Sequence, residues 1–139
     1  MLNELDSTVT TYDFDDATGR MTLCDSASAL PRSYVGNNRS SEIEINRDGR
    51  FLYASNRGHD SIVVFGVGAD GALAVIGWEP SQGRTPHFFA LDSDERYLYA
   101  ANEDSDCIVQ FRCNDGDLTP IGEIMPVGSP TTIVFRDMP

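Results

Sequence analysis

The sequence predicts an all-β fold, and three observations carry that prediction. Short segments rich in Val, Ile, Phe and Tyr recur along the chain, turn-forming residues separate them, and no amphipathic helix of useful length is present. In addition, residues 49–65 (GRFLYASNRGHDSIVVF) repeat at residues 95–111 (ERYLYAANEDSDCIVQF). Repeats of about 20 to 50 residues are typical of solenoids and propellers, so the repetition indicates an architecture as well as a fold class.

The repeat can be aligned along most of the chain. A shift of 46 residues places Asn56 on Asn102, and after the loss of one residue in a turn Gly71 falls on Gly116. A third, N-terminal copy starts late, with Asn3 in the position of Asn56. The period is therefore about 45 to 53 residues.

Each period is predicted to contain four short strands. In the middle copy they are residues 42–46, 51–55, 61–67 and 73–78. Residues 46–49 (NRDG) and 92–95 (DSDE) supply turns between first and second strands. The Asp-Gly pairs at 70–71 and 115–116 supply turns between third and fourth strands, because Gly accepts a positive φ. Four short antiparallel strands per repeat describe one blade of a β-propeller.

The blades predict one partial propeller domain of about three blades. Residues 1–25 are the second to fourth strands of a split blade, residues 42–79 and 87–125 are complete blades, and residues 131–136 are the innermost strand of the split blade. Three blades are too few to close a ring. We expect a second identical chain to complete the split blade in a head-to-tail homodimer, since six blades lie within the usual range of about four to eight. The alternatives are a longer propeller or a three-chain ring.

Composition limits the partners and the location. All 10 basic residues are Arg, and with 22 acidic residues they give a net charge of −12, which disfavours nucleic acid and anionic membranes as partners. No apolar run approaches the roughly 18 to 20 residues that span a bilayer, and the first residues do not resemble a secretion signal, so we expect a cytoplasmic protein. Cys24, Cys107 and Cys113 form no CxxC pair and are expected to be reduced.

Four stretches of the chain carry a family resemblance. They are residues 3–21 (NELDSTVTTYDFDDATGRM), 40–65 (SSEIEINRDGRFLYASNRGHDSIVVF), 83–111 (GRTPHFFALDSDERYLYAANEDSDCIVQF) and 127–135 (VGSPTTIVF). Together they resemble the lactonase family of seven-bladed β-propellers, which includes propeller-type bacterial 6-phosphogluconolactonases and fungal carboxymuconate cyclases. The resemblance covers nearly the whole chain and implies the C-terminal two fifths of such a protein.

Polar residues are predicted to gather at one mouth of the central channel. In a propeller, the loops between second and third strands open on the same face as the connections to the next blade. The first group comprises residues 3–6, 56–60 and 102–106, and the second comprises residues 36–42, 83–87 and 128–130. We expect a polar funnel there.

Glu42 is the first catalytic candidate. It is placed at the start of an innermost strand, where a carboxylate facing the channel can act as a general base on water or on a substrate carbon. The alternative is a strand-end carboxylate paired with a neighbouring Arg. The family resemblance implies that the Glu of the EI motif is the catalytic-site glutamate.

His87 is the second catalytic candidate and a departure from the family. Relatives usually read TPR where this chain reads TPH, and in the related cyclases the resemblance implies that the Arg contacts an anionic substrate. Arg84, three residues earlier, is the candidate replacement for that cation. His87 could bind an anion when protonated or serve as a base.

The other substrate-binding candidates lie in the loops. Arg57 could hold a phosphate or carboxylate bidentately, or it could form a salt bridge to Asp60 or Glu103. His59 could titrate near neutrality or be an exposed loop residue. The remaining candidates are the amides of Asn38 and Asn56.

No metal or cofactor is expected. The acidic runs at residues 92–94 and 104–106 lack the glycine and closing Glu of a calcium-binding loop, and no GxSxG, P-loop or GxGxxG motif occurs. The predicted function is hydrolysis of a sugar lactone such as 6-phosphogluconolactone. The alternatives are a non-catalytic, self-associating propeller remnant for binding or scaffolding, and a cycloisomerase acting on a muconate-type acid.

Overall fold

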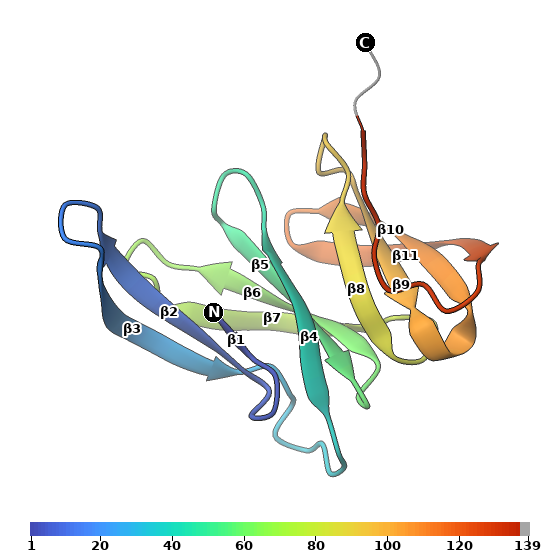
Figure 1. Cartoon of the computed structure of the whole chain (residues 1–139), viewed down its shortest axis with the longest axis horizontal. Coiled ribbons are helices and arrows are strands. Elements are labelled where there is room, and N and C mark those ends of the chain that lie inside the picture. Colours follow the sequence, from blue (N-terminus) through green and yellow to red (C-terminus); the bar gives the residue numbers. More distant parts are fainter. Residues whose placement is uncertain (137–139) are drawn as a thin grey trace.

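The computed structural model describes residues 1–136, apart from the side chains of residues 123 and 124, as one three-stranded and two four-stranded antiparallel sheets. The sheets lie side by side in chain order, as the colours of Figure 1 show. We call them blades 1, 2 and 3. The fold is thus all-β and forms part of a propeller, as the sequence predicted.

The strands follow the repeat. Blade 1 contains β1 (Leu2–Asn3), β2 (Thr8–Asp15) and β3 (Arg20–Ser28). Blade 2 contains β4 (Arg39–Ile45), β5 (Phe51–Arg57), β6 (Ser61–Val67) and β7 (Leu73–Pro80). Blade 3 contains β8 (Pro86–Leu91), β9 (Tyr97–Asn102), β10 (Cys107–Asn114) and β11 (Asp117–Pro126), with the short 3-10 helix η1 (Glu103–Ser105) before β10.

The innermost strands lie next to one another. In blades 2 and 3 each strand pairs with its sequence neighbours, so β4 and β8 are the edge strands that begin each blade. β4 contacts β8, and β1 contacts β4. β4 and β8 therefore border the propeller axis, where the candidate site residues were expected.

Two apolar clusters join the blades. Blades 1 and 2 share a cluster that includes Val9, Val63 and Phe65, and blades 2 and 3 share a larger one that includes Ile62 and Phe111. Full burial of side chains of this size is worth about 1.5–3 kcal/mol each. Alternate residues of β6 serve opposite clusters, because successive side chains of a strand point to opposite faces.

A repeated backbone contact fixes each loop at the channel mouth. The residue before each of β2, β6 and β10 has a positive φ, and its carbonyl accepts a hydrogen bond from the first residue after the last strand of its blade. The pairs are Ser7 with Ala29 (2.8 Å), Asp60 with Ser81 (2.9 Å) and Asp106 with Val127 (2.9 Å). The loop and the connection are thus held together in every blade.

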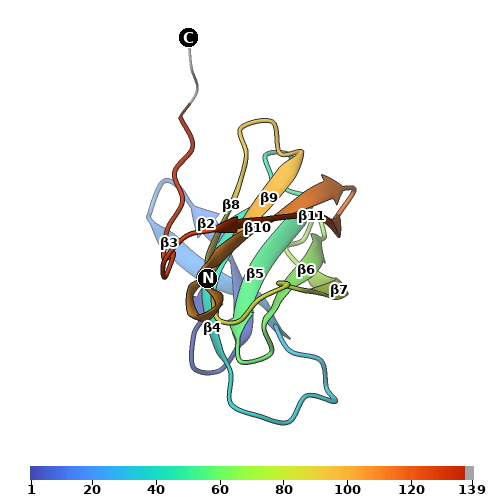
Figure 2. The same ribbon diagram turned by 90° about the vertical axis from the view of Figure 1, so that its right-hand side faces the viewer.

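The connection between blades 1 and 2 is the longer of the two, and Figure 2 shows it projecting beyond the strand ends. It begins at Ala29, which is fully buried. The Ala29 carbonyl accepts hydrogen bonds from Trp78 Nε1 and from Asn56 Nδ2, each at 2.8 Å. Two strands of blade 2 therefore hold the start of this connection.

Several element boundaries differ from those predicted. β1 is only two residues long, β3 continues to Ser28 and β4 starts earlier, at Arg39. Residues 131–136, predicted as an innermost strand, form no ladder in the single chain, because a strand requires a neighbour with which to pair. All three cysteines are free. Within residues 1–136 no helix is long and apolar enough to cross a bilayer.

Candidate functional site

Glu42 lies at a β-bulge in β4. The pairing of β4 with β5 shifts between Ser40 and Ile43, and the Glu42 amide donates instead to Ser55 Oγ at 3.0 Å. A bulge of this kind re-aims a side chain and is common beside active sites. The Glu42 carboxylate accepts the Ile43 amide at 3.0 Å, and no Arg of the described residues pairs with it. The predicted alternative, an ion pair, is therefore not what the structure contains.

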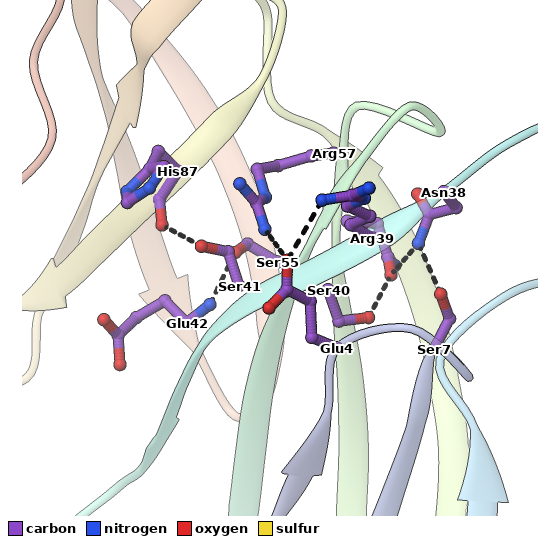
Figure 3. A network of polar contacts seen from close by, with 11 residues as sticks. Glu4, Ser7, Asn38, Arg39, Ser40, Ser41, Glu42, Ser55, Arg57 and His87 are labelled. Atoms are coloured by element: carbon purple, nitrogen blue, oxygen red, sulfur yellow. Dashed lines mark hydrogen bonds and ion pairs between the residues drawn. The ribbon is translucent and has the colours of Figure 1, made fainter.

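His87 occupies the equivalent bulge of the next blade. The pairing of β8 with β9 shifts between Pro86 and Phe88, and the shift of 46 residues places His87 on Ser41. The Ser41 hydroxyl donates to the His87 carbonyl at 2.6 Å, so the two bulges are joined directly (Figure 3). The structure thus brings Glu42 and His87, both predicted catalytic residues, to the same level of adjacent innermost strands.

An open cleft of about 530 Å³ lies at the start of β4. Its lining residues are Leu5, Asn37, Asn38, Arg39 and Arg57. Arg39 and Arg57 are directly opposite each other in the β4–β5 ladder. Such a pair of guanidinium groups suits a phosphate or a carboxylate.

Glu4 of blade 1 lies between the two arginines. Its Oε1 accepts a hydrogen bond from Arg57 Nη2 at 2.8 Å and lies 3.9 Å from Arg39 Nη1. The salt bridge foreseen for Arg57 therefore exists, but its partner is Glu4 rather than Asp60 or Glu103. Two cations and one anion leave the cluster positive by one charge, within a chain whose net charge is −12.

Two buried polar atoms of the site have no partner among the described residues. They are Arg57 Nε and His87 Nδ1. Burying a polar group without a hydrogen bond is costly, and such groups in native proteins are often associated with function. Both belong to residues predicted as site residues from the sequence.

The structure gives Asn56 a role different from the predicted one. Its side chain is fully buried, and its Oδ1 accepts hydrogen bonds from Asn38 Nδ2 (3.1 Å) and Ser40 Oγ (3.0 Å). Its Nδ2 donates to the Ala29 carbonyl. Asn56 therefore joins strands and connections and has no free face for a substrate, so its prediction as a substrate-binding residue was wrong.

Asn38 is also used by the protein itself. Its Nδ2 donates to Ser7 Oγ at 2.8 Å as well as to Asn56, and its Oδ1 accepts the His59 amide at 3.0 Å. Although Asn38 lines the cleft, its polar atoms are engaged in positioning. It supports Arg39, its neighbour, on the cleft wall.

His59 is half-buried in the loop of blade 2, not exposed. Its Nδ1 is 2.7 Å from Ser61 Oγ, and its ring makes an edge contact with Tyr34 at a centroid distance of 4.9 Å. Tyr34 belongs to the long connection that precedes β4. His59 thus holds that connection against blade 2.

Arg84 lies away from the arginine pair. Its guanidinium donates to the Asp104 carbonyl at 3.0 Å and its amide donates to Ser105 Oγ at 2.8 Å, so it is bound to the loop of its own blade. It is not a lining residue of the cleft. The second arginine that lines the cleft with Arg57 is Arg39, which the sequence did not single out.

The environment perturbs one carboxyl group of β4. Burial raises the pKa of Glu44 above its ordinary value of 4.5, and the charge of Glu42 acts in the same direction, whereas a hydrogen bond from the Leu91 amide opposes the shift. Among the described residues, no three His, Cys, Asp or Glu side chains gather as metal ligands would.

In Figure 3 the polar residues run from His87 and Glu42 at one end, through Arg57 and Glu4, to Asn38 and Ser7 at the other. The loops and the strand starts meet as the sequence predicted. Contacts between blades, such as that of Glu4 with Arg57, could not be inferred because they depend on how the sheets stack. The one signal for Arg39 was its place beside Glu42 in the same polar stretch.

The arrangement can be compared with known proteins. The family described as "Lactonase, 7-bladed beta-propeller" matches residues 1–135. The chain belongs to this lactonase family. A 6-phosphogluconolactonase of Bacillus subtilis is 34% identical over 93 residues, which are 66% of this chain and 27% of that protein.

Solved structures agree with this family assignment. The periplasmic gluconolactonase of Pseudomonas aeruginosa superposes with a TM-score of 0.90 at 28% identity, over 98% of this chain and 38% of that one. A protein from Lactobacillus plantarum gives a TM-score of 0.90 at 30% identity, over 92% of this chain and 38% of that one. This lactonase-family chain therefore spans less than two fifths of the solved propellers and about a quarter of the B. subtilis relative.

Proposed function

We propose that this chain hydrolyses a sugar lactone, with Glu42 as general base and 6-phosphogluconolactone as the type of substrate. The observation that carries the proposal is a carboxylate on a bulge of an innermost strand, without a cation partner among the described residues, close along β4 to a cleft with two arginines. A carboxylate left without a salt bridge remains available for proton transfer.

The reaction requires one water molecule and no other reactant. Glu42 takes a proton from water as the water oxygen bonds to the lactone carbonyl carbon. The tetrahedral intermediate then collapses, the bond from that carbon to the ring oxygen breaks, and the ring oxygen takes the proton that Glu42 holds. The products are the open-chain hydroxy acid and the regenerated carboxylate. His87, on the adjacent strand, would donate a hydrogen bond to the substrate.

The cleft with Arg39 and Arg57 can bind an anionic substituent of the substrate. Arg39 precedes Glu42 by three residues on β4, a separation of about 10 Å at roughly 3.3 Å per residue. The Arg side chain covers part of that distance. A phosphate several bonds from the ester group could therefore lie on Arg39 and Arg57 while the ester lies near Glu42.

Two relatives support the substrate class by name. One is called a 6-phosphogluconolactonase and the other a periplasmic gluconolactonase. Both are longer than this chain, and we propose that this chain shares their activity. The chain contributes the segment of the ring that carries Glu42, Arg39 and Arg57.

Lactone hydrolysis by the wild type and by Glu42→Gln tests the proposal. We expect turnover of 6-phosphogluconolactone above the spontaneous rate, and a fall in kcat of at least about 100-fold in the variant, because general-base catalysis contributes about 10²–10⁴-fold. Glu79→Gln, on the outermost strand of the same blade, is the matched control and should retain activity. Equal turnover by wild type and Glu42→Gln would refute the role of Glu42.

The Michaelis constants for two lactones test the role of the arginine cleft. Arg57→Ala should raise KM for the phosphorylated lactone by about 10-fold or more and leave KM for unphosphorylated gluconolactone nearly unchanged, because a charge-assisted bidentate contact is lost. Equal effects on both lactones would place the phosphate elsewhere.

A second candidate is a non-catalytic propeller segment for binding or scaffolding. The observation that favours it is Glu4, which already occupies part of the cation pair, together with the small share of the ring that the chain spans. This candidate predicts that folded protein turns over neither lactone. It also predicts no change in the ultraviolet absorbance of a muconate-type acid, which separates it from the cycloisomerase alternative.

A further inference from the structure

The outer face of blade 1 is apolar and uncovered. Tyr12 occupies the position of Phe65 in blade 2 and of Phe111 in blade 3, both of which are fully buried between blades. On the same face of blade 1, as the β2–β3 pairing shows, lie Phe14, Met21 and Leu23, which are 56%, 51% and 63% exposed. An exposed apolar cluster of this kind on a sheet indicates an interaction surface.

The opposite end of the stack presents the complementary face. Tyr99 and Ile108 of blade 3 occupy the positions of Tyr53 and Ile62, which in blade 2 pack into the next blade. Phe135 packs on Tyr99 at a centroid distance of 5.0 Å. Within the chain, Leu91 of β8 belongs to the same cluster as Tyr53. Residues 131–136 therefore lie where the innermost strand of a following blade belongs.

Charge is complementary between the two ends. Inside the chain, Arg50 of blade 2 packs on Phe51 and reaches Asp115 of blade 3 at 3.4 Å, so a salt bridge spans that blade joint. In blade 3 the equivalent Arg96 packs on Tyr97 and, with Arg112, borders an open cavity of about 290 Å³.

The partner for that cationic end is the hairpin of blade 1. Its turn, which aligns with the turn that carries Asp115, follows Asp15 at the end of β2 and begins with Asp16. The acidic turn of one chain could therefore repeat, with Arg96 of another, the contact that Asp115 makes with Arg50. Opposite charges of this kind guide association and fix its register.

We propose that a second copy of this chain covers the outer face of blade 1 with its own blade 3, head to tail, and adds its residues 131–136 to β1 as the innermost strand of blade 1. β1 is the edge strand of the three-stranded sheet, and strand addition to a free edge is an established mode of association. Two such joints close a ring of six blades.

The second copy also contributes to the site. Ser41, His87 and Thr131 are equivalent positions of successive innermost strands, and Ser41 Oγ donates to the His87 carbonyl. By the same geometry, the hydroxyl of Thr131 from the second copy donates to the Ser41 carbonyl, next to Glu42. The pocket around Glu42 is therefore incomplete in the single chain. This inference does not depend on which reaction occurs there.

The native mass of the protein, measured by light scattering after size exclusion, tests the proposal. We expect a particle of twice 15.3 kDa. Phe14 occupies the position of Val67, which packs against the cluster between blades 1 and 2. Phe14→Asp on blade 1 and Val134→Asp on the added strand should each weaken the dimer at least about 100-fold, because a charge is buried without a partner. Val35→Asp is the control, since Val35 is also exposed but lies in the β3–β4 connection, and it should remain dimeric.

Far-ultraviolet circular dichroism separates dissociation from unfolding. Phe14 and Val134 are 56% and 86% exposed in the single chain, so neither substitution removes a buried contact and both variants should keep their sheets. Mixing the two monomeric variants should restore a dimer through the one joint that remains intact. A monomeric wild type, a trimer, a dimer that survives both substitutions, or a mixture that fails to associate would overturn the proposal.

Discussion

Asn56 and Asn102 occupy the same position in successive blades, and both are fully buried, but their surroundings differ. The side-chain Oδ1 of Asn56 accepts hydrogen bonds from Asn38 and Ser40, whereas the Oδ1 of Asn102 has no partner among the described residues. At the equivalent positions blade 3 has Arg84 and Pro86, and neither donates to Asn102.

The common part of the two environments is the contact that stabilises the stack. The Nδ2 of each Asn donates to the backbone carbonyl that starts the connection from the preceding blade, Ala29 for Asn56 and Ser81 for Asn102. The hydrogen bonds from Asn38 and Ser40, which only Asn56 receives, lie at the channel mouth. Blades 2 and 3 therefore share the hydrogen bond from Asn to the preceding connection. Blade 2 has in addition a polar network around its loop, next to Arg39 and Arg57.

Replacing each Asn by Ala measures this difference and should give the largest effect. We expect Asn56→Ala to lower the free energy of unfolding by about 3 kcal/mol and Asn102→Ala by about 1–2 kcal/mol, because the first leaves more buried partners without a hydrogen bond. Urea denaturation of both variants, with equal m values, is the measurement. Equal losses would show that the extra network of blade 2 contributes nothing to stability.

Gly58 tests whether the loop of blade 2 depends on its backbone geometry. Gly58 has a φ of +122°, and an added Cβ would lie 2.2 Å from the Asn37 carbonyl oxygen. Gly58→Ala should therefore cost about 2–3 kcal/mol of unfolding free energy. In blade 3 the equivalent residue is Asp104, which has no such constraint.

Gly77→Ala is the matched control for this loop variant. An added Cβ at Gly77 would meet nothing within 4 Å, so its denaturation midpoint should stay close to that of the wild type. Because Asn37 lines the cleft, Gly58→Ala should also weaken binding of the phosphorylated lactone. Stability equal to that of Gly77→Ala would contradict the constraint.

Replacing Glu44 should give the smallest change in stability. Blade 3 has Ala90 at the equivalent position, so this carboxyl group is particular to blade 2. Because burial raises the pKa of Glu44 above 4.5, the folded state holds this proton more tightly than the unfolded chain. The contribution of Glu44 to stability is then fully present below pH 4.5 and is lost as the pH rises through the folded pKa. Glu44→Gln should match the wild type near pH 4 and become slightly more stable by pH 7 in urea denaturation. Parallel pH profiles of the two proteins would contradict this expectation.

Much of the fold could be predicted because the pattern repeats. Alternation of apolar residues and turn chemistry at residues 46–49 and 115–116 are local properties, and the shift of 46 residues carries them from blade to blade. The two-residue length of β1 and the early start of β4 could not be predicted. Both depend on which backbone groups find partners, and residues 131–136 show the same dependence, since they form no strand without a neighbour.

The candidate site was predicted in part. Glu42 and His87 were predicted to lie at the start of innermost strands, and the structure places both there, at equivalent bulges; their catalytic role stays a prediction. Asn56 was assigned to the substrate because amides in polar loops resemble ligands in sequence, while its burial depends on the packing of Ala29 and Ser40 around it. Glu4 was missed as the partner of Arg57 because 53 residues separate the two in the chain.

The Ala29 carbonyl marks the boundary between the part of the chain that holds the sheets together and the long connection that borders the channel mouth. Trp78 and Asn56 hold it from two strands of blade 2, so the stack of sheets is secured before the long connection leaves it. Beyond that point the chain runs through Tyr34 to Asn38 without belonging to any sheet. Asn37 and Asn38 at its end are held against blade 2, but exposed positions such as Val35 can change at little cost in stability and so alter what the channel mouth admits. Selectivity can therefore evolve at these exposed positions while the scaffold stays unchanged.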